Sequence, residues 1–248
     1  MSVELEFVGH ACFRLWEDGR PTIVMDPFSH AQCRLPDDGF RLDAETVIVS
    51  SLTDAAHAHV ALVRGEPEVI NALDVAAGKR SATINGAPMA TIRAAEIPDH
   101  PTGPDDNALY AFTAGGLWFA HMGDVGIELS AEEWAAFEGK CDVLLMLTGQ
   151  RYTPKFPELD RIIDILAPTW IVPMHYGLPP LGGEGDSGWG MSPVGAFLQH
   201  RSRDPVVLVR DTKVAFPLAR CGDGRPTIVV LEPSAYTPTR GLVEFSST

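Results

Sequence analysis

The stretch His121-Met122-Gly123-Asp124-Val125-Gly126 directly follows an apolar run, 114–120, that has the length of a buried strand. A second stretch, Pro173-Met174-His175-Tyr176, follows a similar run at 169–172. Each stretch therefore places one metal-competent side chain, Asp124 or His175, on the turn after a strand. His100 lies in a third turn, between two prolines. A carboxylate and two imidazoles on three strand-end turns form the ligand set of a hydrolytic zinc-type site.

The composition sets the class of protein. The chain has 248 residues, 45% of them hydrophobic and 21% charged, which is ordinary for a globular protein with a sizeable core. We expect one domain over 1–248, in which 181–248 is the less recognisable C-terminal part and adds strands at a sheet edge or forms a homo-oligomer contact. The net charge of −14 argues against nucleic acid and anionic membranes as partners, because phosphate contacts need clustered Lys and Arg.

No stretch of the sequence has the pattern of a targeting or membrane segment. The first residues carry neither a basic leader nor an apolar stretch of signal length, and no apolar run reaches the length of a membrane span. We therefore expect a cytoplasmic protein that acts on a small molecule. The four cysteines are widely spaced without a CxxC pair, so we expect free, mostly buried thiols. The glycine-rich segment 182–190 is interpreted as a surface connection, with a lid over the site as the alternative.

Short strands separated by turns dominate the chain, with few helices. Ser130 is expected to cap a helix that has Glu132 and Glu133 in its first turn. The expected strands are 3–8, 12–16, 22–25, 46–49, 68–71, 81–84, 89–95, 109–113, 117–120, 143–147, 170–172, 206–209, 214–216 and 227–231. The other expected helices are 55–63, 158–166 and 193–200.

The order of four motifs resembles the metallo-β-lactamase superfamily, and within it the soluble branch that includes ascorbate-6-phosphate lactonase-like proteins. The motifs are Phe7-Val8-Gly9-His10-Ala11-Cys12-Phe13, Ile23-Val24-Met25-Asp26-Pro27-Phe28, His121-Met122-Gly123-Asp124 and Pro173-Met174-His175-Tyr176. His100 falls where the family has a further histidine. The resemblance spans roughly 1–180 and implies an α/β fold, the four-layer αββα sandwich. It also implies Asp124 and His175 as metal ligands, with His10 and Asp26 orienting them.

One motif of the family is degraded. The family has a His-x-His-x-Asp-His turn after the strand at 46–49, and its ligand positions fall here on Ser51, Thr53, Ala55 and Ala56, which are poor ligands. Asp54 and His57 lie close by and are expected to substitute. If Ala55 begins a helix, Asp54 is its N-cap and His57 lies about one turn on, so both face one mouth, whereas His59 points elsewhere.

The leading hypothesis is a metal-dependent hydrolase that acts on an ester, lactone, amide or phosphoester. One divalent ion, zinc by preference with manganese or iron as alternatives, would be held by His57, His100, Asp124 and His175. Asp54 or Asp26 would accept a proton from the attacking water, with His10 beside them. The alternative is a metal-free member of the fold that binds a ligand or has a structural role. A serine hydrolase using Ser50 or Ser51 is disfavoured, because no Gly-x-Ser-x-Gly elbow is present.

Overall fold

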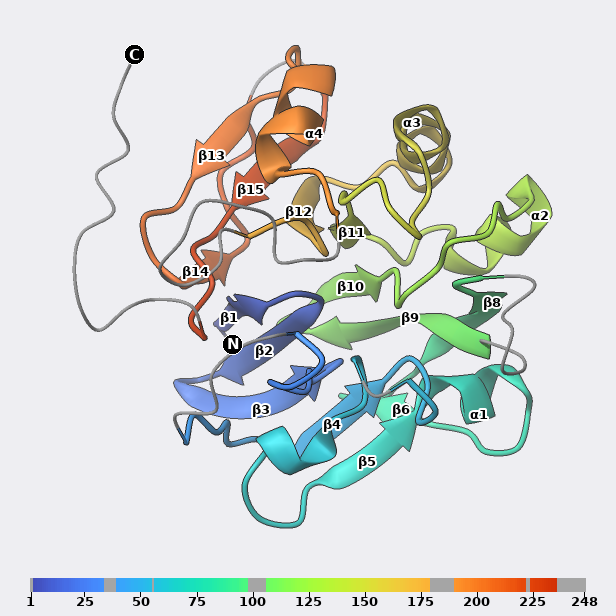
Figure 1. The fold of residues 1–248 in the computed structure, drawn as a ribbon, viewed down its shortest axis with the longest axis vertical. Helices are drawn as coiled ribbons and strands as arrows, with labels where there is room; N and C mark the ends of the chain where they lie inside the picture. Colours follow the sequence, from blue (N-terminus) through green and yellow to red (C-terminus); the bar gives the residue numbers. More distant parts are fainter. Residues whose placement is uncertain are drawn as a thin grey trace.

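The computed structural model describes residues 2–33, 39–54, 56–97, 106–178, 190–221 and 224–235. Two β-sheets face each other in these residues (Figure 1). The first sheet has the order β14-β1-β2-β3-β4-β5. Its strands are β1 Val3–Gly9, β2 Cys12–Glu17, β3 Arg20–Met25, β4 Thr46–Val49, β5 Glu68–Asn71 and β14 Lys213–Phe216.

The second sheet has the order β13-β15-β12-β11-β10-β9-β8. Its strands are β8 Ala90–Ala95, β9 Asp106–Ala114, β10 Leu117–His121, β11 Val143–Leu147, β12 Trp170–Met174, β13 Val206–Leu208 and β15 Thr227–Val230. A separate hairpin pairs β6 Thr83–Ile84 with β7 Ala87–Pro88. The helices are α1 Ala72–Ala76, α2 Ala131–Trp134, α3 Phe156–Leu166 and α4 Val194–His200, with 3-10 helices η1 Val60–Leu62 and η2 Ala135–Phe137.

Strand direction brings one set of strand ends to the same edge of the sandwich. Strands β3, β4 and β5 are parallel, and β1 runs with them because β2 is antiparallel to both β1 and β3. In the second sheet, β10, β11, β12 and β15 are parallel. The turns after β1, β3 and β4 therefore leave one edge of the first sheet, and those after β10, β11 and β12 leave one edge of the second.

The apolar residues of the first sheet pack on both of its faces. Side chains such as Leu5, Phe13 and Met25 join the large core between the sheets. The opposite face, with Val24 and Val47, packs against residues of the loop before β4 and of η1. Helices α3 and α4 lie on the outer side of the second sheet (Figure 1). The αββα prediction is confirmed, although within the described residues the outer layer over the first sheet is reduced to η1 and irregular chain.

Two helix predictions need correction. The expected helix over 55–63 is wrong, because only Val60–Leu62 is helical and that turn is 3-10. Here backbone groups bond elsewhere: the His59 amide donates to the Pro27 carbonyl over 2.7 Å, which anchors this segment to the β3 turn. Helix α1 was not expected from the sequence, and its N-cap Asn71, whose side chain accepts from the Leu73 amide, is the signal that marks it.

The expected helix after Ser130 is confirmed at its first turn. Ser130 accepts from the Glu133 amide, and the Glu133 carboxylate accepts from the Ser130 amide in return, which makes a complete capping box. The four cysteines are free, and three of them are buried. None of the described helices is long and apolar enough to cross a membrane.

Candidate metal centre

The candidate site lies where the strand-end turns of the two sheets meet. His10 follows β1, Asp26 follows β3, the segment leading to His57 follows β4, Asp124 follows β10 and His175 follows β12. Two backbone hydrogen bonds tie the sheets together here: the His175 amide donates to the His10 carbonyl over 2.8 Å, and the Ala108 amide to the Ser50 carbonyl over 3.0 Å. The site is therefore built on the junction of the two layers.

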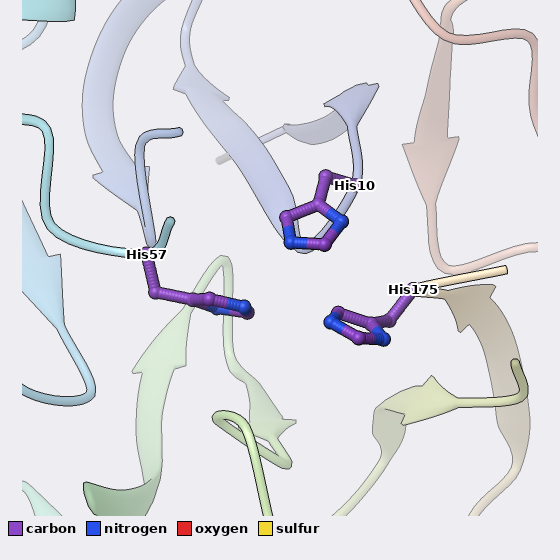
Figure 2. A group of neighbouring side chains, drawn as sticks. All are labelled: His10, His57 and His175. Carbon is purple, nitrogen blue, oxygen red and sulfur yellow. The ribbon is translucent and has the colours of Figure 1, made fainter. Parts of the chain in front are cut away.

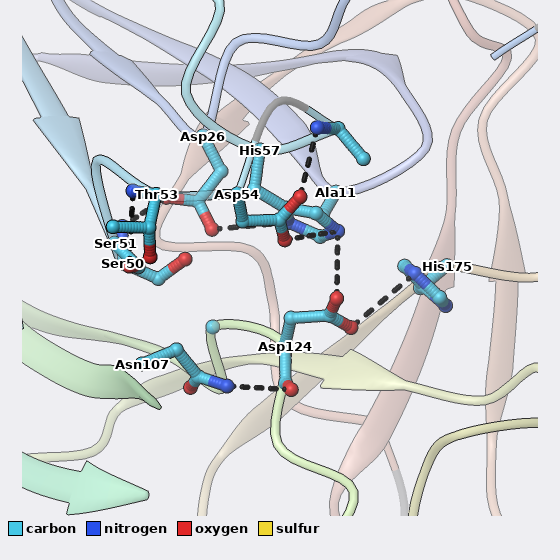
Figure 3. Close-up of polar contacts among 12 residues, drawn as sticks. Ala11, Asp26, Ser50, Ser51, Thr53, Asp54, His57, Asn107, Asp124 and His175 are labelled. Carbon is cyan, nitrogen blue, oxygen red and sulfur yellow. Dashed lines mark hydrogen bonds and ion pairs between the residues drawn. The ribbon is translucent and has the colours of Figure 1, made fainter. Parts of the chain in front are cut away.

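His57 occupies the centre of the cluster and is fully buried. Its Nδ1 lies 3.3 Å from Oδ2 of Asp26. Because an ionised carboxylate only accepts hydrogen bonds, Nδ1 carries a proton and donates a hydrogen bond to Asp26. Nε2 then faces the interior of the site, 3.2 Å from Oδ2 of Asp124 (Figure 3). A histidine whose outer nitrogen is anchored on a carboxylate and whose inner nitrogen faces another ligand has the arrangement of a metal-ligating imidazole.

Asp124 bridges two histidines. Its Oδ2 faces His57, and its Oδ1 lies 3.4 Å from Nε2 of His175 (Figure 3). The Asp124 carbonyl accepts from the Asn107 amide group over 2.8 Å, which holds the turn in place. Tetrahedral ligands at zinc–ligand bonds of about 2.0–2.2 Å lie roughly 3.3–3.5 Å apart, and each of these two distances, taken to a different oxygen of Asp124, is close to that separation.

His10 belongs to the same cluster. Ligand nitrogens of His10, His57 and His175 lie within 4.8 Å of one another, and the three rings converge from different turns (Figure 2). The His10 ring centroid is 4.3 Å from that of His175 and 4.8 Å from that of His57. We expected His10 only to orient the metal ligands. In the structure its ring is also close enough to His57 and His175 to act as a ligand itself.

Asp54 lies at the rim of the cluster. Its Oδ2 is 4.0 Å from Nε2 of His57, and a ligand atom of Asp54 groups with one each of His57 and Asp124 within 4.8 Å. Its other oxygen accepts from the Ala56 amide, so Asp54 closes a side-chain turn instead of capping the expected helix. This turn directs His57 inward. The sequence analysis also selected His57, but on the assumption of a helix in place of this turn.

The remaining predicted positions divide into three groups. Ser51 and Thr53 hydrogen-bond each other through their hydroxyls over 2.8 Å, so they contact each other at the degraded motif. Ala56 is buried and supplies no ligand atom. Ala55, His100 and the glycine-rich segment 182–189 lie outside the described residues.

Three further residues of the site were missed in the sequence. The Tyr110 hydroxyl donates to Oδ1 of Asp26 over 3.1 Å, and the Ser50 amide donates to the same oxygen over 2.8 Å. Asn107 fixes the Asp124 turn. Tyr110 and Asn107 lie on β9, Tyr110 within an apolar run of the sequence and Asn107 just before it, and the strand pairing brings both to the site.

His121 is buried but committed to the backbone. Its Nδ1 accepts from the Gly123 amide over 2.9 Å, so its Nε2 carries the proton and donates to the Ala11 carbonyl over 2.9 Å. Its ring stacks on Tyr110 with an interplanar angle of 2°. His121 therefore shapes the Asp124 turn and offers no free lone pair to a metal.

Burial and neighbouring charges set opposite protonation states for the histidines. Burial would lower the pKa of His57, but the Asp124, Asp54 and Asp26 carboxylates outweigh it and raise the pKa to about 10. Burial, together with His57, lowers the pKa of His175 to about 3. Burial and the neighbouring His175 and His57 also lower the pKa of His10. Without an ion, the cluster therefore favours neutral His10 and His175 and a protonated His57, whose proton an ion would have to displace.

Backbone strain is concentrated at the same turns. His10, Asp26 and His175 all have positive φ, at 55°, 41° and 53°. Non-glycine residues adopt this conformation rarely, and such residues collect at functional sites. Gly123 has a φ of 58°, and a Cβ there would lie 2.8 Å from the Ala108 carbonyl oxygen, so the Asp124 turn needs glycine at this position.

Comparisons with known proteins identify the family of the chain. The family model described as "Beta-lactamase superfamily domain" matches residues 4–175. A UPF0173 metal-dependent hydrolase of Pyrococcus furiosus is 24% identical over 201 residues, which cover 73% of this chain and 88% of the relative.

Solved structures share the fold over nearly the whole chain. A metallo-β-lactamase superfamily protein of Thermotoga maritima has a TM-score of 0.62 at 25% identity, covering 92% of this chain and 98% of that one. A metallo hydrolase of Ignicoccus hospitalis has a TM-score of 0.57 at 18% identity, covering 94% and 96%.

Proposed function

Because the chain belongs to the β-lactamase superfamily, we propose that it is a metal-dependent hydrolase acting on a small-molecule ester, lactone, amide or phosphoester. One observation carries this proposal: the buried Nε2 of His57 has no hydrogen bond within the described residues, and it lies 3.2 Å from Oδ2 of Asp124. The description of the Pyrococcus furiosus relative as a metal-dependent hydrolase supports the same activity.

We assign His57, Asp124 and His175 as the ligands of one divalent ion, with His10 as a neighbouring donor and His100 as a further predicted ligand. Two imidazoles and a carboxylate suit zinc, and manganese or iron are the alternatives. A divalent ion in such a site supplies an acidified water and polarises the bond to be cleaved. The proposed cofactor is thus a metal ion, and its identity is for experiment to decide.

The two nearby carboxylates have different roles in this proposal. Asp26 is fully buried and accepts from the Ser50 amide, the Tyr110 hydroxyl and His57, so it positions His57 and holds its Nδ1 proton. Asp54 has a side chain that is 19% exposed and lies at the rim, where solvent reaches it. Asp54 is therefore our candidate for accepting a proton from the attacking water.

A second candidate is a metal-free member of the fold. The ion pair between His57 and Asp124 favours it, because a protonated His57 can satisfy the Asp124 carboxylate without an ion. In that case the site would bind a ligand without cleaving it. The two candidates differ in metal content, which makes metal content the deciding measurement.

The test is metal analysis by inductively coupled plasma mass spectrometry on protein purified without added metal or chelator. We expect about one divalent ion per chain, reduced at least tenfold in Asp124→Ala and Asp124→Asn. Asp164→Ala, which removes an exposed carboxylate from α3, is the matched control and should keep its metal. Absence of metal from the wild type after reconstitution with zinc, manganese and iron would reject the hydrolase in favour of the metal-free candidate.

A further inference from the structure

The loop after β11, residues 148–155, lies between the two turns that carry Asp124 and His175. Strand β11 pairs with β10 on one side and with β12 on the other, all parallel, so its carboxyl end opens between theirs. The Thr148 amide donates to the Met174 carbonyl over 3.0 Å. This loop is therefore placed beside the candidate metal centre by the sheet itself.

Two glycines show how closely the loop is packed against both turns. A Cβ on Gly149 would lie 2.1 Å from the carbonyl oxygen of His175. On the other side, a Cβ on Gly126, two residues after Asp124, would lie 2.8 Å from the carbonyl oxygen of Tyr152. The backbone of the loop thus touches the turn of His175 at Gly149 and the turn of Asp124 at Tyr152, and Arg151 lies between these two contacts.

The loop is held in one shape by Gln150. Its side chain donates to the Pro154 carbonyl over 3.1 Å and accepts from the Phe156 amide over 3.2 Å, and its carbonyl accepts from the Lys155 ammonium. Gln150 and Tyr152 both have positive φ, at 61° and 52°. Strained backbone fixed by side-chain hydrogen bonds presents its outward side chains in a preorganised arrangement.

Arg151 and Tyr152 are the side chains that this loop presents. Tyr152 is 46% exposed, and the Arg151 guanidinium lies 5.0 Å from the centre of its ring and donates to its hydroxyl over 3.3 Å. Arg151 is exposed and forms no ion pair with any carboxylate of the described residues. In a chain with a net charge of −14, an exposed arginine that pairs with no carboxylate of the described residues is suited to bind an anion.

We propose that Arg151 and Tyr152 form a recognition pair for a substrate that carries a carboxylate or phosphate group next to an apolar or aromatic portion. The guanidinium would bind the anionic group with two parallel hydrogen bonds, and the exposed tyrosine ring would pack on the apolar portion. This inference rests on the proposed hydrolase function and gives that function a substrate class. Arg151 and Tyr152 act in binding, while the bond cleaved lies at the metal centre.

Binding is tested first, because it needs no turnover. Zinc-loaded protein is titrated calorimetrically with phenylacetate, phenyl phosphate and the neutral analogue phenylacetamide. We expect at least one anion to bind about tenfold more tightly than phenylacetamide, and Arg151→Gln to remove that preference, since it removes the charged hydrogen bonds to the anion. Arg151→Lys should keep part of the preference. Comparison of phenylacetate with phenyl phosphate identifies which anionic group the site prefers.

Arg203→Gln is the matched control, since Arg203 is exposed and precedes β13, at the opposite ends of the parallel strands. It removes the same charge and should leave the anion preference unchanged. Tyr152→Ala should weaken all three probes by a similar factor, about three- to tenfold, because it removes the packing surface and not the charge. Zinc content measured on every variant shows that the metal site is intact.

The outcomes separate this inference from the proposed function. An anion preference that persists undiminished in Arg151→Gln would overturn the inference and assign the preference to the ion, even in an active hydrolase. A preference that is lost in Arg151→Gln but kept in Arg203→Gln would support the pair. That support stands if no ester, lactone, amide or phosphoester is hydrolysed, in which case only the hydrolase proposal falls.

Discussion

At the scale of single residues, the protonation of His57 gives a prediction that is independent of substrate. Folding raises the pKa of His57 to about 10, above its unfolded value of about 6.5. Its contribution to stability is therefore complete below pH 6.5 and is lost as the pH rises through about 10. His175 acts in the opposite direction: its folded pKa is about 3, so its contribution is present above pH 6.5 and is lost as the pH falls.

Metal-free protein should accordingly lose stability between about pH 7 and 10, a range in which His175 is neutral in both states. We expect the thermal midpoint of chelator-treated protein to fall by several degrees over this range, since each kcal/mol corresponds to roughly 2–4 °C in a chain of this size. The acidic chain has other titrating groups, so the difference between wild type and His57→Gln is the relevant measurement. Parallel midpoint curves for the two proteins would contradict the assignment of a charged His57.

Residue patterns predicted part of the site and missed part of it. Asp124 and His175 were predicted because each follows an apolar run of strand length and has a glycine or proline nearby, and the structure brings the two side chains together. His57 was chosen although the family motif fails around it, and the structure brings it into the cluster. The role of Tyr110 could not be predicted, because its hydroxyl reaches Asp26 across 84 positions of sequence and its own surroundings are those of a core strand.

At the scale of elements, local sequence patterns predicted the strands better than they predicted the conformation of the segment that carries His57. The Ser130 capping box follows from residues three apart, and the structure has it. The segment 55–63 lacks helix breakers, and this favoured a helix. Hydrogen bonds to a distant loop decided otherwise, because the His59 amide pairs with Pro27 and not with its own turn. The spacing of apolar residues in a short segment cannot predict that a backbone amide will bond to a distant loop in place of its own helical turn.

The loop after β11 gives a prediction about one element. Gly149→Ala would place a Cβ 2.1 Å from the His175 carbonyl oxygen and so push the loop away from the His175 turn. We expect a loss of about 1–3 kcal/mol in the free energy of unfolding and about tenfold weaker zinc binding. The matched control is Gly195→Ala in α4, where nothing lies within 4 Å of the added Cβ. This control should stabilise the protein by about 0.5–1 kcal/mol. Equal zinc affinity in both variants would show that the loop does not support the site.

At the scale of the whole molecule, the order of strands in the sheets was beyond reach of the sequence. The positions of the strands along the chain could be predicted, but their partners could not: β14 pairs with β1 at the edge of the first sheet, whereas β13 and β15 join the second sheet. The pairing of β14 with β1 connects residues about 200 positions apart, and no local sequence pattern predicts it. The resemblance to a known family supplied the sandwich, whereas residues past 180 carried no motif that placed them.

We propose that these C-terminal strands belong to the same cooperative folding unit as the rest of the chain. A substitution of Phe216 on β14 tests this proposal. Its backbone pairs with Val3 of the first sheet, and its ring makes edge contacts with Phe119 and Trp170 of the second, at centroid distances of 5.9 and 5.5 Å. Phe216→Ala should therefore loosen both sheets at once.

We expect Phe216→Ala to lower the free energy of unfolding by about 3–5 kcal/mol, the usual cost of removing a buried phenylalanine. Unfolding should keep a single transition that coincides in tryptophan fluorescence and far-ultraviolet circular dichroism. Leu208→Ala on β13 is the control, because that side chain is 68% exposed and its loss should cost less than about 0.5 kcal/mol. Two separate transitions in the Phe216 variant, with only one destabilised, would mean that the C-terminal strands fold as an independent unit. A single displaced transition would mean that the candidate metal centre, which lies at the junction of both sheets, is part of a folding unit that includes the C-terminal strands.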